Sequence, residues 1–336
     1  MLTNKDWIKA TLAHRETGRV PYNFMFSPPA MTRLCAHFGV GDVNDAVKMP
    51  IRTNAPASPK PLYADPDVFG PTVTDEFGVV WSTNYIDRGA PLVYALPEAD
   101  LSRYTFPDPR APGRFDGLAE WCAANTEHYT GMWVGALWER ATFMRGMEEL
   151  LYDLAENRQF VEDLLEALTD NILRTMEALF TLGEFDCCCL SDDYGSQKAL
   201  LMSPADWRAL IKPRLERMVD LAKKHHRQFF LHSCGCVEQI IPDLIELGLD
   251  ILHPIQPETM DIYRLKREFG SDITFCGGIR TQDLLPLGTP AEVRAEVRKL
   301  KEVMGAGGGY ILEPGITLQD DVPLPNLVAM VEEAMA

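Results

Sequence analysis

The sequence has no long apolar segment and no excess of basic residues, and both absences restrict the kind of protein it can be. No run approaches the roughly 20 consecutive apolar residues that a membrane-spanning helix requires. Residues 1–9 contain no apolar stretch of the kind found in secretory signal peptides, so we expect a cytoplasmic protein. The chain carries 49 acidic but only 32 basic residues, a net charge of -17. This charge should repel phosphate backbones and anionic lipids, so we expect neither a nucleic-acid partner nor a membrane partner.

A reducing compartment also disfavours disulfide bonds, so the eight cysteines are interpreted as free thiols or metal ligands. Three of them are consecutive, at positions 187–189, and on a strand they cannot all point to one side. We interpret these three as small buried apolar side chains. The cysteines that stand beside other polar residues, Cys234 and Cys276, are better candidates for chemistry.

No glycine-rich dinucleotide-binding motif follows any predicted strand, whereas strands and helices alternate regularly through the second half of the chain. Apolar runs predict strands at 185–190, 227–231, 250–252, 273–275 and 309–312. Amphipathic stretches predict helices at 204–224, 237–247, 259–269, 290–304 and 324–336. Short apolar strands alternating with helices are typical of a parallel sheet that is covered on both faces. We therefore predict an α/β fold, a single (β/α)8 TIM barrel formed by residues 1–336.

The first half of the chain is less regular. Residues 19–26 and 129–137 are predicted to form the first two strands, and helices are expected at 143–156 and 160–181. Between these strands, about residues 40–125 are rich in proline, aspartate and glycine. We expect a long insertion there, with a small hairpin around residues 74–81.

Chemically active side chains follow several of the predicted strands. The C-terminal ends of the strands form the active site in enzymes with this fold. The residues at these positions are Asp192, Asp193, Tyr194, His232, Cys234, His253, Gln256, Cys276 and Glu313. Two histidines, two cysteines and three carboxylates at one end of a barrel indicate a reactive site more strongly than scattered polar loop residues would.

The segment His232-Ser233-Cys234 predicts a metal site. Residues i and i+2 of a strand face the same side, so the imidazole and the thiolate can bind one ion together. Catalytic zinc accepts nitrogen and sulfur ligands and has three protein ligands and one open position. For the third ligand we consider Glu313 and Cys276. The alternative for His232 and Cys234 is a buried histidine beside a packed thiol. The alternative for Cys276 is a packed thiol before a Gly-Gly turn, and for Glu313 it is an acidic residue in a surface loop.

Asp192, Asp193 and Tyr194 are candidates for catalysis. The two aspartates could form an acid–base pair, since neighbouring carboxylates raise the pKa of one of the pair, or they could hold a cation or hydrogen-bond the substrate. Tyr194 could hydrogen-bond the substrate. The alternative for Asp193 is a helix cap. Gln197, Gln256 and Arg280 are candidates for binding the substrate.

These residues lie in segments that resemble the uroporphyrinogen decarboxylase-like superfamily, and the resemblance covers nearly the whole chain. The similar segments are residues 4–21, Asp75-Glu76-Phe77-Gly78-Val79-Val80-Trp81, Ser191-Asp192-Asp193-Tyr194-Gly195-Ser196-Gln197, His232-Ser233-Cys234-Gly235, Gly277-Gly278-Ile279 and residues 310–326. The resemblance implies a (β/α)8 barrel and leaves a homodimer possible.

True decarboxylases of this superfamily carry arginines after the first strand, which bind the substrate carboxylates. Residues 24–29 contain none, and the late Gly-His-Gly-Ile segment is replaced by Glu313-Pro314-Gly315-Ile316. The chain more closely resembles the corrinoid-dependent methyltransferases, including methylcobamide:coenzyme M methyltransferases, whose His-x-Cys segment binds zinc. Their further cysteine ligand corresponds to Ile316, which is a departure from the pattern.

The resemblance therefore implies an enzyme that transfers a methyl group, with zinc as its cofactor. It implies two partners, a corrinoid (cobalamin-type) protein and a small-molecule methyl donor or acceptor. One alternative is a metal-free carboxy-lyase that acts on a carboxylate-bearing substrate through Asp192, Tyr194 and His232. Another is a non-catalytic binding component of a corrinoid system.

Overall fold

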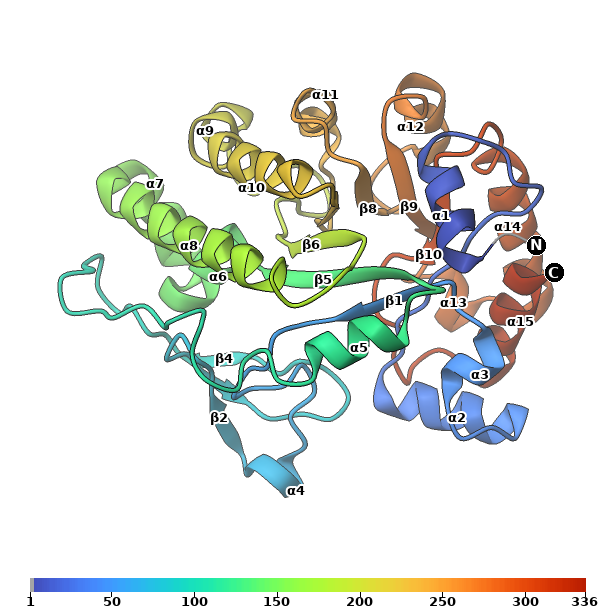
Figure 1. The fold of residues 1–336 in the computed structure, drawn as a ribbon, viewed down its shortest axis with the longest axis horizontal. Coiled ribbons are helices and arrows are strands. Elements are labelled where there is room, and N and C mark those ends of the chain that lie inside the picture. The colour runs from blue at the N-terminus through green and yellow to red at the C-terminus, as the bar shows by residue number, and fades with distance from the viewer. Residues whose placement is uncertain (1–2) are drawn as a thin grey trace.

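The computed structural model describes residues 3–336, which form an α/β fold built on a curled parallel sheet (Figure 1). Seven strands pair in the order β1-β5-β6-β7-β8-β9-β10, and every neighbouring pair is parallel. Their bounds are Ile51–Asn54 (β1), Tyr129–Gly135 (β5), Cys187–Ser191 (β6), Gln228–His232 (β7), Ile251–Ile255 (β8), Thr274–Ile279 (β9) and Tyr310–Pro314 (β10). Side chains from all seven strands line one small interior cavity, so the sheet curls around a common axis.

The predicted first strand, residues 19–26, does not join the sheet as a regular strand. It makes two isolated parallel bridges near the end of the chain, Tyr22 with Leu312 and Phe26 with Leu318. Its side chains nevertheless alternate as in a strand. Asn23 and Met25 line the interior cavity, whereas Tyr22, Phe24 and Phe26 are buried in the outer core, where neighbouring rings lie 5.5 and 6.1 Å apart. In the described residues this segment closes one side of the sheet without a full hydrogen-bond ladder, and Pro21 cannot donate to one.

The stretch predicted as an insertion contains one strand of the main sheet. Strand β1 pairs with β5 over its whole length, with Ile51 opposite Tyr129. After β1, this stretch forms a separate three-stranded antiparallel sheet and two short helices, drawn below the main sheet in Figure 1. Their bounds are Pro66–Phe69 (α4), Thr72–Thr74 (β2), Val80–Ser82 (β3), Pro91–Val93 (β4) and Leu118–Ala124 (α5). The predicted hairpin around residues 74–81 is the β2–β3 pair.

Helices surround the sheet and bury its outer face (Figure 1). They are Asn4–Leu12 (α1), Pro28–Phe38 (α2), Val43–Val47 (α3), Trp138–Arg145 (α6), Met147–Glu156 (α7), Arg158–Leu179 (α8), Pro204–Leu210 (α9), Lys212–Lys224 (α10), Ile241–Glu246 (α11), Ile262–Phe269 (α12), Leu284–Leu287 (α13), Pro290–Val303 (α14) and Leu324–Met335 (α15), with a 3-10 turn at Glu238–Ile240 (η1).

Two helix boundaries show local sequence effects. The single helix predicted for residues 204–224 is divided into α9 and α10 at Ile211, because Pro213 lacks the amide hydrogen that an uninterrupted helix needs. Helix α14 begins where the sequence predicts, with Thr289 and Glu292 forming a capping box.

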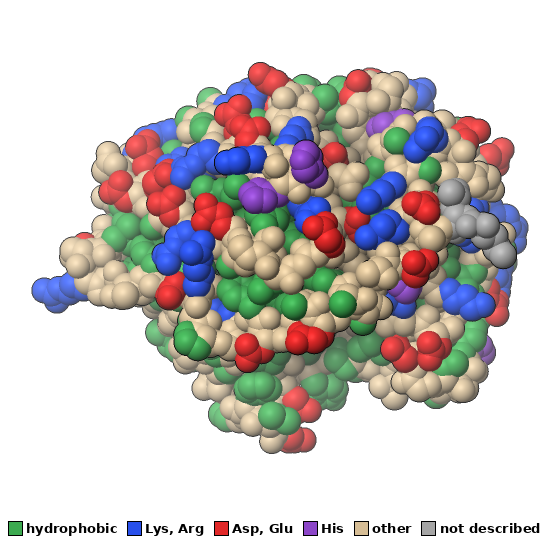
Figure 2. Space-filling view, in the orientation of Figure 1, with side chains coloured by type: hydrophobic (Ala, Val, Ile, Leu, Met, Phe, Trp, Pro, Cys, Tyr) green, Lys and Arg blue, Asp and Glu red, His purple; other side chains and the backbone are tan. Residues whose placement is uncertain are grey.

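The surface carries both signs of charge despite the acidic composition. On the face shown in Figure 2, lysine and arginine side chains are interspersed with acidic ones. None of the helices in residues 3–336 combines the length and the apolar character that crossing a lipid bilayer requires.

Candidate functional site

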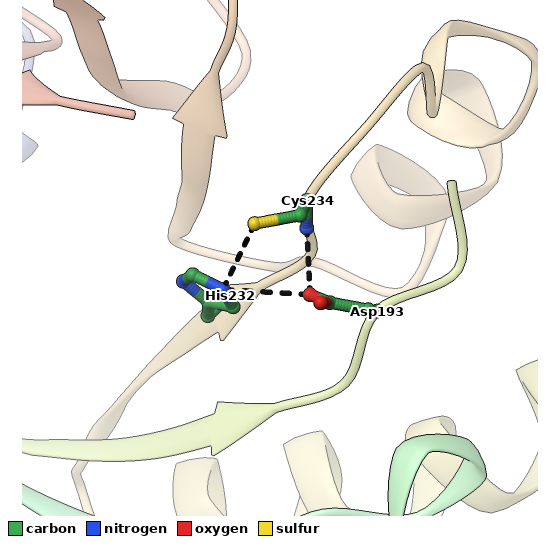
Figure 3. Close-up of side chains that lie close together, drawn as sticks. All are labelled: Asp193, His232 and Cys234. Atoms are coloured by element: carbon green, nitrogen blue, oxygen red, sulfur yellow. Dashed lines mark hydrogen bonds and ion pairs between the residues drawn. The ribbon is translucent and has the colours of Figure 1, made fainter. Parts of the chain in front are cut away.

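Three potential metal ligands meet at the C-terminal ends of two neighbouring strands (Figure 3). His232 is the last residue of β7, Cys234 follows two residues later, and Asp193 follows β6, the strand beside β7. The Nε2 atom of His232 lies 3.4 Å from the Cys234 Sγ and 3.4 Å from the Asp193 Oδ1. All three donor atoms lie within 4.8 Å of one another.

This geometry suits zinc. Zinc–ligand distances of about 2.0–2.3 Å place the corners of a tetrahedral site roughly 3.3–3.6 Å apart. The two separations of 3.4 Å from His232 fall in this range. The His232 and Asp193 side chains are 16% and 29% exposed, so one side of the cluster faces solvent. Nitrogen, sulfur and oxygen donors with an open side are the arrangement expected of a catalytic zinc site.

The loop that carries Cys234 is fixed by its neighbours. The Cys234 backbone N–H donates to the Asp193 Oδ1 at 2.8 Å, which orients the carboxylate. The next N–H, of Gly235, donates to the Gln256 Oε1 at 2.5 Å. Gly235 has a φ of 83°, and a Cβ at this position would lie 2.4 Å from the Gly195 backbone carbon. Only glycine permits this approach of the two loops.

The second nitrogen of His232 contacts another histidine. His232 and His253 are register partners on β7 and β8, and their Nδ1 atoms are 2.9 Å apart, so one proton lies between the two rings. Burial and the neighbouring His232 lower the pKa of His253 well below its usual value. Burial opposes protonation of His232 as well, but hydrogen bonds with Asp193 and Cys234 raise its pKa well above the usual value. A metal-bound histidine is usually held from its second nitrogen by a carboxylate, a carbonyl or water, and here His253 takes that position.

Glu313 and Cys276, the two residues considered as the third ligand, lie in a different cluster. Together with His253 they face the interior of the sheet, and the Cys276 thiol donates to the Glu313 Oε2 at 3.0 Å. Burial raises the pKa of Glu313 to about 7, against hydrogen bonds from Cys276 and Asn23. Burial and Glu313 raise the pKa of Cys276. The residue that lies beside His232 and Cys234 is Asp193, because β6 is adjacent to β7 in the sheet.

Asp192 and Tyr194, predicted as catalytic with Asp193, lie inside the protein. Asp192 is 0% exposed, and its Oδ1 accepts the backbone N–H groups of Leu137 and Glu139 at 3.1 and 2.7 Å, which caps α6. Burial raises the pKa of Asp192 to about 7, although the hydrogen bond from the Glu139 N–H and the nearby Tyr194 side chain lower it. Tyr194 is also 0% exposed and packs edge-on against Trp207. Alternation along the chain thus separates these residues, with Asp193 in the cluster and its two neighbours in the core.

The three predicted substrate-binding residues are placed differently from one another. Gln256 is buried and holds the loop after Cys234. Gln197 is exposed and accepts a hydrogen bond from Gln282 at 3.2 Å. Arg280 pairs with Asp283 at 2.7 Å and with Glu296 at 3.8 Å.

Other arginines near this end of the sheet are also neutralised by carboxylates. Arg140 pairs with Asp75 at 2.6 Å, and Arg145 pairs with Asp153 at 2.8 Å. Arg88 pairs with Glu139 at 2.8 Å. These pairs leave no cluster of unpaired arginines around Asp193, His232 and Cys234 in the described part of the chain.

His253 was predicted to lie at the end of the barrel without a specific role, and Asn23 was not predicted at all. His253 ends the predicted strand that follows the strand of His232, so pairing in register could have suggested that the two rings touch. Asn23, whose Nδ2 donates to the Glu313 Oε1 at 2.9 Å, joins residues 290 positions apart, and no local signal indicates this.

The fold and the site can now be compared with known proteins. The family model described as uroporphyrinogen decarboxylase (URO-D) matches residues 80–336, and the chain therefore belongs to this family. Within it, the chain is similar to the methylated-thiol–coenzyme M methyltransferase of Methanosarcina mazei, at 23% identity over 235 residues. This match covers 70% of the chain but only 56% of that methyltransferase, little more than half its length.

A solved structure shows the same fold. A methyltransferase from Methanosarcina mazei superposes with a TM-score of 0.73 at 17% sequence identity, and the match covers 100% of this chain and 99% of that one. The resemblance indicated by the sequence motifs, to the methyltransferase branch of the uroporphyrinogen decarboxylase-like proteins, is confirmed by these matches.

Proposed function

We propose that the protein is a corrinoid-dependent methyltransferase with zinc bound by Asp193, His232 and Cys234. It transfers a methyl group between a small methylated substrate or thiol and a corrinoid carried by a partner protein. The observation that carries the proposal is the 3.4 Å spacing of His232 Nε2 from both the Cys234 sulfur and the Asp193 oxygen. The similarity to methyltransferases of the same family supports it.

The charge of the cluster favours a divalent cation. A bound dication would displace the protons of its ligands, so that Asp193 and Cys234 would balance its charge and His232 would become the neutral third donor. Zinc at this site would supply a Lewis acid, which lowers the pKa of a substrate thiol. The protein contributes a rigid frame, in which His253 holds the His232 ring and the Cys234 N–H holds Asp193.

Asp193 also accounts for the departure from the family pattern at Ile316. The Ile316 side chain is 43% exposed and has no atom that could bind a metal. With Asp193 as the third protein ligand, the site has the three that a catalytic zinc requires. The fourth position is open to substrate.

Two alternatives fit the structure less well. A metal-free carboxy-lyase would use arginines to bind carboxylates, but Arg140, Arg145 and Arg280 are already paired with acidic side chains. Its proposed acid–base groups, Asp192 and Tyr194, are 0% exposed. A non-catalytic binding component that has lost a zinc ligand at Ile316 would bind no zinc and show no turnover, but Asp193 supplies a third donor beside His232 and Cys234.

Metal content and methyl transfer test the proposal together. The purified protein is analysed for zinc by mass spectrometry and assayed for demethylation of methylcobalamin with a thiol acceptor, followed by its absorbance. Cys234→Ala should lose one zinc per chain and the activity, because a ligand is removed. Cys236→Ala is the matched control, since this half-buried cysteine lies two residues further on and outside the cluster, and it should retain both. Unchanged zinc in Cys234→Ala would contradict the site, and a wild-type protein with neither bound zinc nor turnover would support the binding component.

A further inference from the structure

We propose that the protein has a second metal site, in the interior of the curled sheet, where His253, Cys276 and Glu313 bind a thiophilic divalent cation such as Zn²⁺. This inference goes beyond the proposed function, because none of the three residues belongs to the cluster at the strand ends. They lie on the neighbouring strands β8, β9 and β10 and are 1%, 1% and 2% exposed.

The donor atoms already converge on one point. The Cys276 thiol donates to the Glu313 Oε2 at 3.0 Å, and the His253 Nε2 lies 3.7 Å from the same oxygen. All three donors lie within 4.8 Å of one another. A cation at their centre would replace the thiol proton, so that a sulfur–metal bond forms as one proton is released.

Two polar groups in this cluster indicate a missing partner. The His253 Nε2 is buried and makes no hydrogen bond of ordinary geometry among residues 3–336, which is costly for a polar atom, although the Pro314 backbone lies close enough to His253 to raise its pKa. The Asn23 Nδ2 donates to the other Glu313 oxygen, Oε1, at 2.9 Å. Asn23 thereby fixes the carboxylate while Oε2 remains directed at the cysteine and the histidine. A cation would satisfy the Nε2 atom and the carboxylate together.

The surroundings suit a closed site for a soft ion. The three residues line a cavity of about 30 Å³, large enough for an ion or a water molecule. Cys187 and Cys189 line the same cavity, so the wall is rich in thiols. Sulfur and imidazole donors select zinc-like ions over magnesium or calcium. Three protein ligands leave one coordination position of a tetrahedral ion, and the cavity has room for a water molecule to fill it.

The contact between His253 and His232 couples the two sites. One proton lies between their Nδ1 atoms, which are 2.9 Å apart, and both Nε2 atoms point to separate ligand groups. Both rings can bind a metal through Nε2 if they share only this one proton. The histidine pair then carries one negative charge, which the two neighbouring dications offset. The interior site is therefore tested most cleanly where the site at the strand ends has been disabled.

The experiment starts from the double variant Asp193→Asn, Cys234→Ser, which lacks two of the three ligands at the strand ends. The protein is expressed with supplementary zinc, and its metal content is measured by mass spectrometry after purification. We expect one zinc per chain. Adding Cys276→Ser, or separately Glu313→Gln, should remove it, while adding Cys122→Ser should not, since this thiol is equally buried but lies on α5.

A folded double variant without zinc would overturn the proposal, and so would zinc that survives both Cys276→Ser and Glu313→Gln. Circular dichroism establishes that each variant is folded, and the two separate substitutions guard against failure of either one to fold. Failure of this proposal can be distinguished from failure of the proposed function. The proposed function is tested by methyl transfer and by the zinc that Cys234→Ala loses.

Discussion

Asp186, which precedes β6, should be among the acidic residues that contribute most to stability. Its side chain is 6% exposed, and its Oδ2 accepts the Thr130 N–H at 3.0 Å and the Thr130 hydroxyl at 3.1 Å. Lys5 and Lys9 of α1 form ion pairs with the same carboxylate at 3.1 and 3.0 Å. Asp186 therefore joins α1, β5 and β6 at the N-terminal end of the sheet.

Asp186→Ala should lower the free energy of unfolding because it leaves the donors of Thr130 without an acceptor. Thr130 is 1% exposed, so its two donors would be buried without an acceptor, at about 1–3 kcal/mol each. The lysine side chains are 24% and 49% exposed, and each exposed ion pair contributes at most about 1 kcal/mol. We expect the free energy of unfolding to fall by about 3–5 kcal/mol, mostly because the two buried donors of Thr130 lose their acceptor.

The effect should depend on pH. Burial would raise the pKa of Asp186, but the hydrogen bond from Thr130 and the contacts with Lys9 and Lys5 lower it overall. A carboxyl group with a lowered pKa in the folded state stabilises the protein above its unfolded pKa of about 3.9. This contribution is lost as the pH falls through the lower folded value. The difference in stability between the wild type and Asp186→Asn should therefore be greatest at neutral pH and shrink below about pH 4.

Urea denaturation followed by circular dichroism measures both effects. Glu184→Ala is the matched control, because Glu184 lies two residues away and pairs with Arg227 at 2.9 Å but is 87% exposed. This variant should change the free energy of unfolding by less than about 1 kcal/mol. Equal losses in Asp186→Ala and Glu184→Ala would refute the reasoning from burial. If the difference in the free energy of unfolding between the wild type and Asp186→Asn stayed constant from pH 7 to pH 3, the stabilising role of the ionised Asp186 carboxylate would be refuted.

Two further predictions concern the loop after β7 and the substrate. Gly235→Ala should weaken zinc binding at least tenfold, because the added Cβ would meet the Gly195 backbone and displace Cys234. Gly117→Ala, also at a positive φ but with nothing within 4 Å, should leave zinc binding unchanged, and equal metal affinities measured by chelator competition would contradict this. The protein should not convert uroporphyrinogen to coproporphyrinogen, because residues 24–29 carry no arginine and the arginines near the strand ends are paired. Formation of coproporphyrinogen at an ordinary enzymatic rate, detected by chromatography, would disprove this prediction.

The second half of the fold could be predicted from the sequence to within a few residues. The predicted strands at 185–190, 227–231, 250–252, 273–275 and 309–312 correspond to β6 to β10. Their sequences are apolar along their whole length because helices cover one face and the interior lies on the other. This pattern is local, so the sequence alone reveals it.

The first half could not be predicted in the same way. Strand β1 has the sequence Ile-Arg-Thr-Asn, which carries little of the apolar pattern of a buried strand, and its strand structure depends on pairing with β5. Residues 19–26 have the side-chain alternation of a strand, but their backbone partners are residues 312 and 318. In both cases the deciding contacts are distant in sequence, and no local pattern encodes them.

The candidate site divides along the same line. That His232 and Cys234 share one side of a strand end could be predicted from the sequence, because alternate residues of a strand point the same way. The positions of Cys276 and Glu313 after later strands could be predicted as well. Which of these residues meet depends on the tertiary structure. Asp193 joins His232 and Cys234 because β6 pairs with β7, whereas Cys276 and Glu313 join His253 because β8, β9 and β10 are neighbours around the curled sheet. Ligand identity is a property of single residues, but ligand grouping depends on strand order and curvature, which arise from packing across the whole chain.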